Sequence, residues 1–134
     1  MTMTSTTSAS QVRTIAPVLT VNDLQASIAF FEGLGFGMGE RWEHEGKLVG
    51  VMVKAGDLEI GLSQDDWAKG RDRQKGLGVR VFITTTQNID ELAARAKQAG
   101  VKFDKEPHDT PWGARAIDLT APSGFKLTIS SHQE

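Results

Sequence analysis

The sequence predicts an α+β fold of two tandem βαβββ modules, which form an open, cup-shaped mixed β-sheet with the helices outside. Three observations favour it. The order strand, helix and three strands occurs twice, and the stretch from helix-ending glycine to turn glycine has a similar length in both passes, 35–56 and 100–124. The helical segments are apolar on one face, and several strands alternate apolar with polar residues. Since a helix covers one face of a sheet, the opposite faces of both modules are left to line a cup.

The first module covers about residues 15–63. Its apolar, β-branched start predicts a strand over residues 15–21, after which Asn22 or Asp23 caps a helix. Apolar residues recur at helical spacing until glycines at 33 and 35 end that helix. Three strands are predicted to follow at residues 36–43, 48–54 and 58–63, with turns at 45–46 and 56–57.

The second module covers about residues 77–130, after a polar and charged linker at residues 64–76. Alternation through residues 79–83 predicts its first strand, Asn88 or Asp90 caps its helix, and Gly100 ends that helix. Strands are predicted near residues 101–103, 115–119 and 125–130, with a turn at 122–124. The charge runs of the linker, 65–66 and 71–73, are interpreted as solvated surface.

Composition indicates one ordinary domain, residues 14–134, preceded by a flexible tail at residues 1–13. The chain has 134 residues, of which 39% are hydrophobic and 24% charged. A net charge of −2 without a basic patch argues against nucleic acid as a partner, and no apolar run is long enough to span a bilayer. Because the chain has no cysteine, thiol catalysis and disulfides are excluded, and we expect a cytoplasmic protein.

Two segments in each half carry a resemblance to a known family. They are Val21–Phe31 followed by 33–36 (Gly-Leu-Gly-Phe), then 111–115 (Pro-Trp-Gly-Ala-Arg) and 121–124 (Ala-Pro-Ser-Gly). In this order and spacing they resemble the vicinal oxygen chelate superfamily of glyoxalases, bleomycin-resistance proteins and extradiol dioxygenases. The resemblance covers about residues 15–130, implies the fold given above, and implies a homodimer whose cups are completed across a two-fold interface.

Metal-dependent members of that superfamily place His or Glu at four inward strand positions. By register these positions fall on Ala16, Gly61, Gly78 and Thr128, none of which suits a catalytic divalent ion. If the register is shifted, Glu59 takes the ligand position assigned to Gly61, but a single carboxylate makes a poor metal site. His44, His108 and His132 are interpreted as surface histidines, with His108–Asp109 the one pair suited to acid–base work. We therefore expect no metal and no cofactor, and the resemblance is closest to the metal-free bleomycin-resistance branch.

Selectivity without a metal has to come from aromatic surface and a few polar groups. Trp112 is the first candidate for a stacking wall and Trp42 the second, while Trp67 is a lid, an interface or a surface residue. Arg80 and Phe82 lie opposite the apolar face of their strand, where Arg80 pairs either with an anionic guest or with Glu59 or Asp118. The candidate ligand-binding residues are Trp112, Arg80, Phe82, Arg115, Trp42, Met52, Glu59 and Thr128.

These observations favour a metal-free small-molecule-binding protein that sequesters an aromatic antibiotic or natural product, as in antibiotic resistance. The alternative is a metal-dependent glyoxalase- or dioxygenase-like enzyme, hence a lyase or a dioxygenase, with displaced ligands drawn from Glu59, His44, His108 or Glu43. A metal-free enzyme that uses Arg80 or His108–Asp109, and a purely structural module, also stay open. The sequence leaves enzymatic activity undecided and leans toward binding alone.

Overall fold

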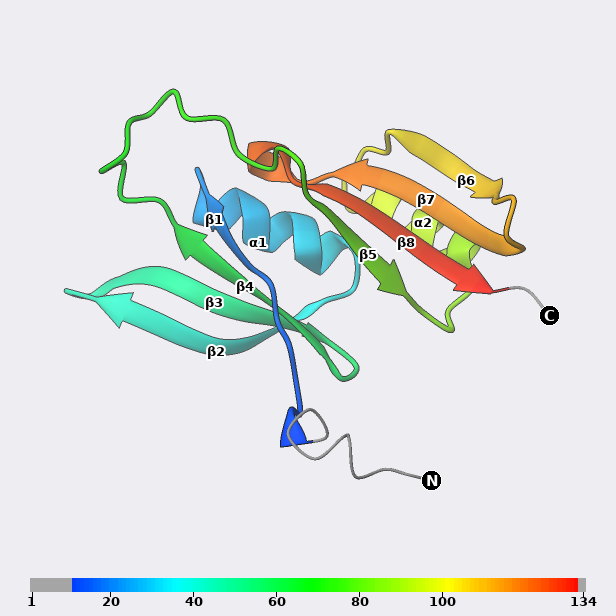
Figure 1. Ribbon diagram of the computed structural model, residues 1–134, viewed down its shortest axis with the longest axis horizontal. Coiled ribbons are helices and arrows are strands. Elements are labelled where there is room, and N and C mark those ends of the chain that lie inside the picture. Colours follow the sequence, from blue (N-terminus) through cyan, green and yellow to red (C-terminus); the bar gives the residue numbers. More distant parts are fainter. Residues whose placement is uncertain (1–10, 133–134) are drawn as a thin grey trace.

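The computed structural model describes residues 11–132 and contains two four-stranded mixed sheets with two α-helices (Figure 1). The strand orders are β1-β4-β3-β2 and β5-β8-β7-β6, so the predicted α+β class with tandem βαβββ modules is confirmed. Over residues 11–132 the strands form two open sheets and no closed barrel. The elements are β1 Val18–Val21, α1 Leu24–Gly33, β2 Gly37–His44, β3 Lys47–Ala55, β4 Leu58–Gln64, β5 Arg80–Thr84, α2 Ile89–Gln98, β6 Lys105–Asp109, β7 Ala114–Thr120, the 3-10 turn η3 Pro122–Gly124, and β8 Lys126–His132.

The two sheets repeat one pairing scheme. In each module the first strand runs parallel to the last, β1 with β4 and β5 with β8, and the remaining pairs are antiparallel. Val18 pairs with Gly61 in the first sheet, and Phe82 pairs with Thr128 in the second. The duplication inferred from the sequence therefore extends to strand order and direction.

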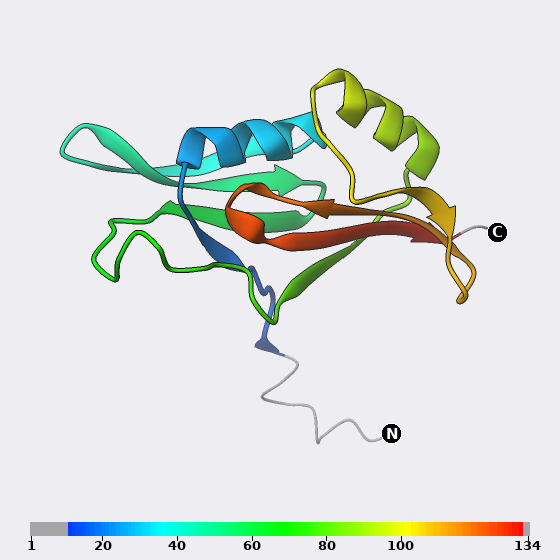
Figure 2. The same ribbon diagram turned by 90° about the horizontal axis from the view of Figure 1, so that it is seen from above.

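Both helices cover the same side of the two sheets, as Figure 2 shows from above. The inward faces of helices and strands form one cluster of buried apolar side chains that includes Phe31, Ile60, Ile117 and Leu127. Burial of this apolar surface is the main force that holds the modules together. The opposite faces of both sheets carry no helix in the described part of the chain.

Both helices end in the same Schellman motif. Gly35 and Gly100 have φ of +97° and +92°, the left-handed conformation that this motif requires. The N–H of Phe36 donates to the carbonyl of Phe31 at 3.0 Å, and in the second module Val101 donates to Ala96 at 3.0 Å. The predicted helix stops are confirmed, and both modules use the same hydrogen-bond pattern and the same left-handed glycine.

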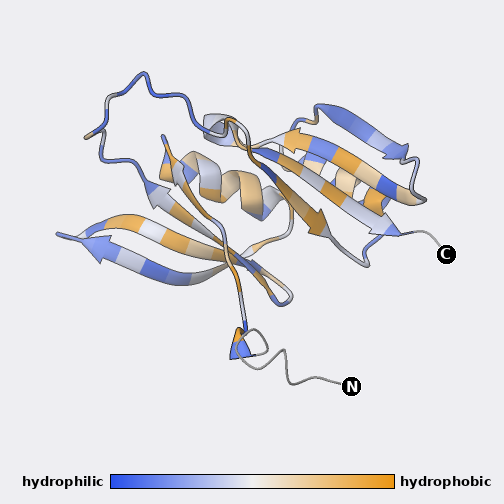
Figure 3. Ribbon diagram, viewed as in Figure 1, coloured by the Kyte–Doolittle hydropathy of each residue, from blue (hydrophilic) through white to orange (hydrophobic). Residues whose placement is uncertain are grey.

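The strand predicted at residues 101–103 is wrong, because Val101 belongs to the helix stop. Its buried side chain follows Gly100 and covers the last turn of α2. The strand forms instead at Lys105–Asp109 as β6, the outer strand of its sheet. All five of its residues are polar or proline, and Figure 3 shows it as hydrophilic, which explains why apolar alternation did not reveal it.

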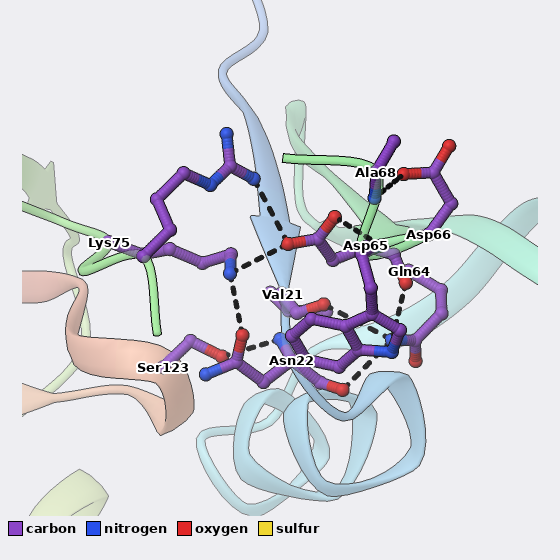
Figure 4. Close-up of polar contacts among 10 residues, drawn as sticks. Val21, Asn22, Gln64, Asp65, Asp66, Ala68, Lys75 and Ser123 are labelled. Carbon is purple, nitrogen blue, oxygen red and sulfur yellow. Dashed lines mark hydrogen bonds and ion pairs between the residues drawn. The ribbon is translucent and has the colours of Figure 1, made fainter. Parts of the chain in front are cut away.

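Part of the linker is buried, contrary to the interpretation of residues 65–66 as solvated surface. The side chain of Asp65 is 5% exposed and pairs with the Lys75 ammonium at 2.8 Å and with Arg73 at 3.0 Å (Figure 4). Lys75 also donates to the amide oxygen of Asn22 at 2.6 Å, at the start of α1. These contacts hold the linker against the first module. Asp66 and residues 71–73 are exposed, as predicted.

The Asn22 backbone N–H donates to the Ser123 hydroxyl at 2.8 Å, which joins the first module to η3 of the second. A Cβ on Gly76 would lie 2.4 Å from the carbonyl oxygen of Gly124, so the linker passes the same turn in backbone contact. Most of the tail expected at residues 1–13 lies outside the described residues. Neither α1 nor α2 has the length and apolar character needed to cross a membrane.

Candidate ligand-binding face

The strand faces opposite the helices carry large apolar side chains that water reaches. We call this surface the open face. Trp42 is 43% exposed, Phe82 53% and Val18 65%. Trp112, in the turn between β6 and β7, is 59% exposed. Exposed apolar groups that gather in this way mark a binding or association surface.

The first module contributes an apolar pocket of 230 Å³ to the open face. Val18 of β1, Trp42 of β2, Met52 of β3 and Gly61 of β4 line it. These residues come together because Gly61 pairs with both Val18 and Met52, and Gly50, the neighbour of Met52 on that face, pairs with Trp42. A Cβ on Gly61 would lie 3.0 Å from Cγ2 of Val18 and 3.2 Å from Sδ of Met52. The glycine therefore leaves space that any larger side chain would fill.

The second module contributes a cationic pocket of 420 Å³. Arg80 and Phe82 of β5 line one side, and Lys105 and His108 of β6 line the other. Trp112 stands at its edge, and Asp118 and Thr128 also contribute to the lining. Lys105 is not among the residues that the sequence pattern indicates, because the strand predicted at residues 101–103 ends before it.

A series of hydrogen bonds holds the Arg80 side chain in this pocket. Its Nη1 donates to Oγ1 of Thr128 at 2.8 Å and to the carbonyl oxygen of Leu127 at 3.2 Å. The Thr128 hydroxyl in turn donates to Oδ1 of Asp118 at 2.8 Å, which lies 4.0 Å from Nη1 of Arg80. Of the two partners considered for Arg80, Asp118 is the neighbour, while Glu59 pairs with Lys54 at 3.7 Å.

Arg115 lies away from the open face. Its guanidinium reaches α2, where it contacts Asp90 at 3.0 Å, and it also contacts Asp109 at 3.2 Å. These contacts raise the pKa of Arg115, chiefly through the hydrogen bond to Asp90, and the same bond lowers the pKa of the Asp90 carboxyl. Asp109 is thereby paired with Arg115 and, among the described residues, not with His108. Nδ1 of His108 lies 2.8 Å from the carbonyl oxygen of Glu106 and donates to it.

The side chains that the structure describes offer no donor set for a divalent metal. No group of three or more His, Cys, Asp or Glu side chains within residues 11–132 is arranged to hold one. Ala16 and Gly78 precede β1 and β5. Gly61 pairs with Val18 and Met52, and Thr128 pairs with Phe82 and Asp118. Asp118 is the one carboxylate among these strand partners, and a single carboxylate is too few donors for such an ion.

The donors considered as displaced ligands are also dispersed. His44 lies beside Glu45 at the β2–β3 hairpin, with 4.0 Å between Nε2 and Oε1. His108 is on β6, and Glu59 is paired with Lys54.

The two βαβββ modules and their shared open face place the chain in the class of two-module α+β proteins. The model of the glyoxalase/bleomycin resistance protein/dioxygenase superfamily matches residues 12–129, and the chain belongs to this superfamily. No curated protein matches the chain significantly.

Solved structures with the same fold share little sequence with the chain. A glyoxalase/bleomycin resistance protein/dioxygenase from Nocardioides is 21% identical with a TM-score of 0.67, over 97% of this chain and 91% of that one. TioX from Micromonospora sp. ML1 is 17% identical with a TM-score of 0.72, over 91% and 100% of the two chains. A lactoylglutathione lyase from Agrobacterium tumefaciens is 19% identical with a TM-score of 0.63, over 89% and 92%. At these identities the comparison establishes the fold alone.

Proposed function

We propose that the protein binds a small organic molecule on the open face without a metal ion, and that it acts by sequestering that molecule. The proposal rests on one observation. Exposed aromatic rings line two pockets, and neither lining holds a set of metal donors. Ligand sites are concave and mostly apolar, with a few polar groups that fix orientation. The two pockets together have this composition, with Arg80 as the main polar anchor.

We further propose that two copies of the chain form the complete site. Each sheet ends at an edge strand, β1 or β5, and exposed apolar residues precede both strands: Ile15 is 91% exposed and Val79 is 56% exposed. A two-fold dimer would bring the apolar pocket of one copy against the cationic pocket of the other, twice over. Each guest would then lie between two walls of different chemistry.

A thermal-shift screen of aromatic natural products and antibiotics tests the binding proposal. The protein is first treated with a chelator, and each compound is measured with and without added Zn²⁺, Ni²⁺, Mn²⁺ or Fe²⁺. We expect some compounds to raise the melting temperature of chelator-treated protein, because a ligand that binds only the folded state stabilises it. A shift that requires the metal would instead favour the metal-dependent enzyme.

Variants locate the binding site. Trp112→Ala and Trp42→Ala each remove an exposed ring, so they should weaken binding of any hit while leaving the melting temperature of the free protein nearly unchanged. Trp67→Ala is the matched control, because Trp67 lies in the linker and contacts Arg71 and Lys75. Equal loss of binding in all three variants would contradict a site on the open face.

A further inference from the structure

We infer that the guest of this site is an aromatic anion whose carboxylate, or a similar group, is held by Arg80 and Lys105. The inference rests on the proposed function, since it names the chemical class that the proposed site accepts. It depends on the charge balance of the cationic pocket, on the geometry of Arg80, and on the difference between the two pockets.

The charge balance of the cationic pocket favours an anion. Arg80 and Lys105 each carry a positive charge, and Asp118 carries the one negative charge on the open-face side of the pocket. Asp109 also borders the pocket, but its charge is balanced by Arg115 at 3.2 Å. Lys105 makes no ion pair within residues 11–132. One net positive charge is therefore left for a guest to neutralise.

Arg80 is held in position with part of its guanidinium free. Both hydrogen bonds that it makes among the described residues use Nη1, to Thr128 and to Leu127, which leaves Nη2 and Nε. The side chain is 45% exposed, so a guest can reach these atoms. Because Thr128 is itself bonded to Asp118, the guanidinium is oriented before a guest arrives. An oriented guanidinium with two free donor atoms matches the geometry of a carboxylate.

The aromatic part of the guest follows from the rings in the lining of the cationic pocket. Phe82 lies two residues further along β5, and Trp112 lines the same pocket, with 53% and 59% of their surfaces exposed. In the proposed dimer the facing wall is the apolar pocket of Val18, Trp42 and Met52, whose lining contains no charged residue. A guest that satisfies both walls is amphipathic, with a flat apolar body and one anionic end.

Three probes of the same shape and different charge test the inference. They are 2-naphthoate, 2-naphthamide and 2-naphthylmethylammonium, titrated into the full-length protein by calorimetry at about pH 7. We expect naphthoate to bind at least about tenfold more tightly than naphthamide, since hydrogen bonds to a charged group are stronger than neutral ones. The ammonium probe should bind most weakly of the three.

Substitution of Arg80 assigns the charge preference to one residue. Arg80→Gln should reduce naphthoate affinity by about tenfold, to nearly that of naphthamide, while naphthamide affinity changes little. Arg80→Lys keeps the charge but not the paired donors, so it should recover only part of the affinity. Arg95→Gln, an exposed arginine on α2, is the matched control and should bind all three probes like the unsubstituted protein. A circular dichroism melt of each variant shows that it is folded.

The outcomes separate this inference from the proposed function. If naphthoate and naphthamide bind equally well, or the ammonium probe binds best, the inference is wrong and the binding proposal stands. If naphthoate is preferred but Arg80→Gln, still folded, keeps the preference, the anion lies elsewhere and the assignment to Arg80 is wrong. If none of the probes binds at about 1 mM, both this inference and the aromatic guest of the proposed function are rejected.

Discussion

Asp65 illustrates how one buried carboxylate can fix the path of a linker. Its side chain lies between Lys75 and Arg73, and Lys75 bridges it to Asn22 at the start of α1. Asp65→Asn removes the charge and leaves the buried Lys75 ammonium, 4% exposed, without its anion. We expect the melting temperature to fall by several degrees in a thermal melt. Asp66→Asn, at the exposed neighbour, should change it by no more than about 1 °C, and a similar loss in both variants would contradict the role of Asp65.

The same carboxylate predicts a dependence of stability on pH. The Lys75 ammonium, with the Trp67 N–H and Arg73, holds the pKa of Asp65 well below its usual range. A carboxyl whose pKa is lower in the folded than in the unfolded state stabilises the fold above about pH 3.9, and this contribution is lost as the pH falls below that value. Urea unfolding should therefore show a gap between the unsubstituted protein and Asp65→Asn that is full at about pH 7 and narrower at about pH 2.5. A gap that widens on acidification would refute this assignment.

The face on which a strand residue lies can be predicted most directly where its strand shows a clear alternation. Arg80 and Phe82 stand opposite Val81 and Ile83, so their side of β5 was correctly anticipated. On β7 apolar residues occupy both faces, with Ala114 and Ala116 on one side and Ile117 and Leu119 on the other. The pattern therefore gave no basis for choosing the face of Arg115.

The two helix stops should respond alike to substitution. Gly35→Ala and Gly100→Ala each force a side chain into a left-handed conformation, although open space surrounds both positions. Each should cost about 1 kcal/mol of unfolding free energy, measured by urea titration. Gly37→Ala is the control, because Gly37 has an ordinary φ and equally open surroundings, so it should be close to neutral. Unequal losses at Gly35 and Gly100 would mean that the two motifs do not contribute equally.

The sequence reveals most elements because their signals are local. Helix caps, helix-ending glycines and hairpin turns depend on a few adjacent residues, and the predicted strand at residues 58–63 differs from β4 by a single residue. β6 is the exception, since the polar segment Lys105–Asp109 becomes a strand only by pairing with β7. Asp65 is similar: its burial depends on Lys75, ten residues further along the chain. Features created by tertiary contact leave little trace in a local pattern.

The two pockets of the open face lie in different modules and differ in the chemistry of their linings. The apolar pocket belongs entirely to the first module and the cationic pocket entirely to the second. In the proposed dimer each pocket is half of a complete site, since a ligand site usually encloses most of its guest. Strand order and direction repeat between the modules, but the residues at matching positions differ: Gly61 faces Val18, and Thr128 faces Phe82. The duplicated framework thus supplies two walls of different character.

If a second copy brings these walls together, ligand binding and dimer formation are linked. Ile15 and Val79 precede the edge strands β1 and β5 and are largely exposed in one chain, so glutamate at both positions should not harm the fold of the monomer. In a dimer closed along these edges, the double variant Ile15→Glu and Val79→Glu would bury four like charges. We expect sedimentation velocity to show a dimer for the unsubstituted protein and at least a tenfold weaker association, by about 1.4 kcal/mol or more, for the variant.

Ala94→Glu adds one acid on the exposed side of α2, against two in the double variant, and should leave the dimer intact, which controls for acid added away from the strand edges. The double variant should also lose naphthoate binding, because each of its copies keeps only half of the proposed site. An unsubstituted protein that stays monomeric at about 100 μM yet binds naphthoate would show that one chain suffices. The second wall would then have to come from within the same chain, and the separation of apolar and cationic pockets between modules would have no role in assembly.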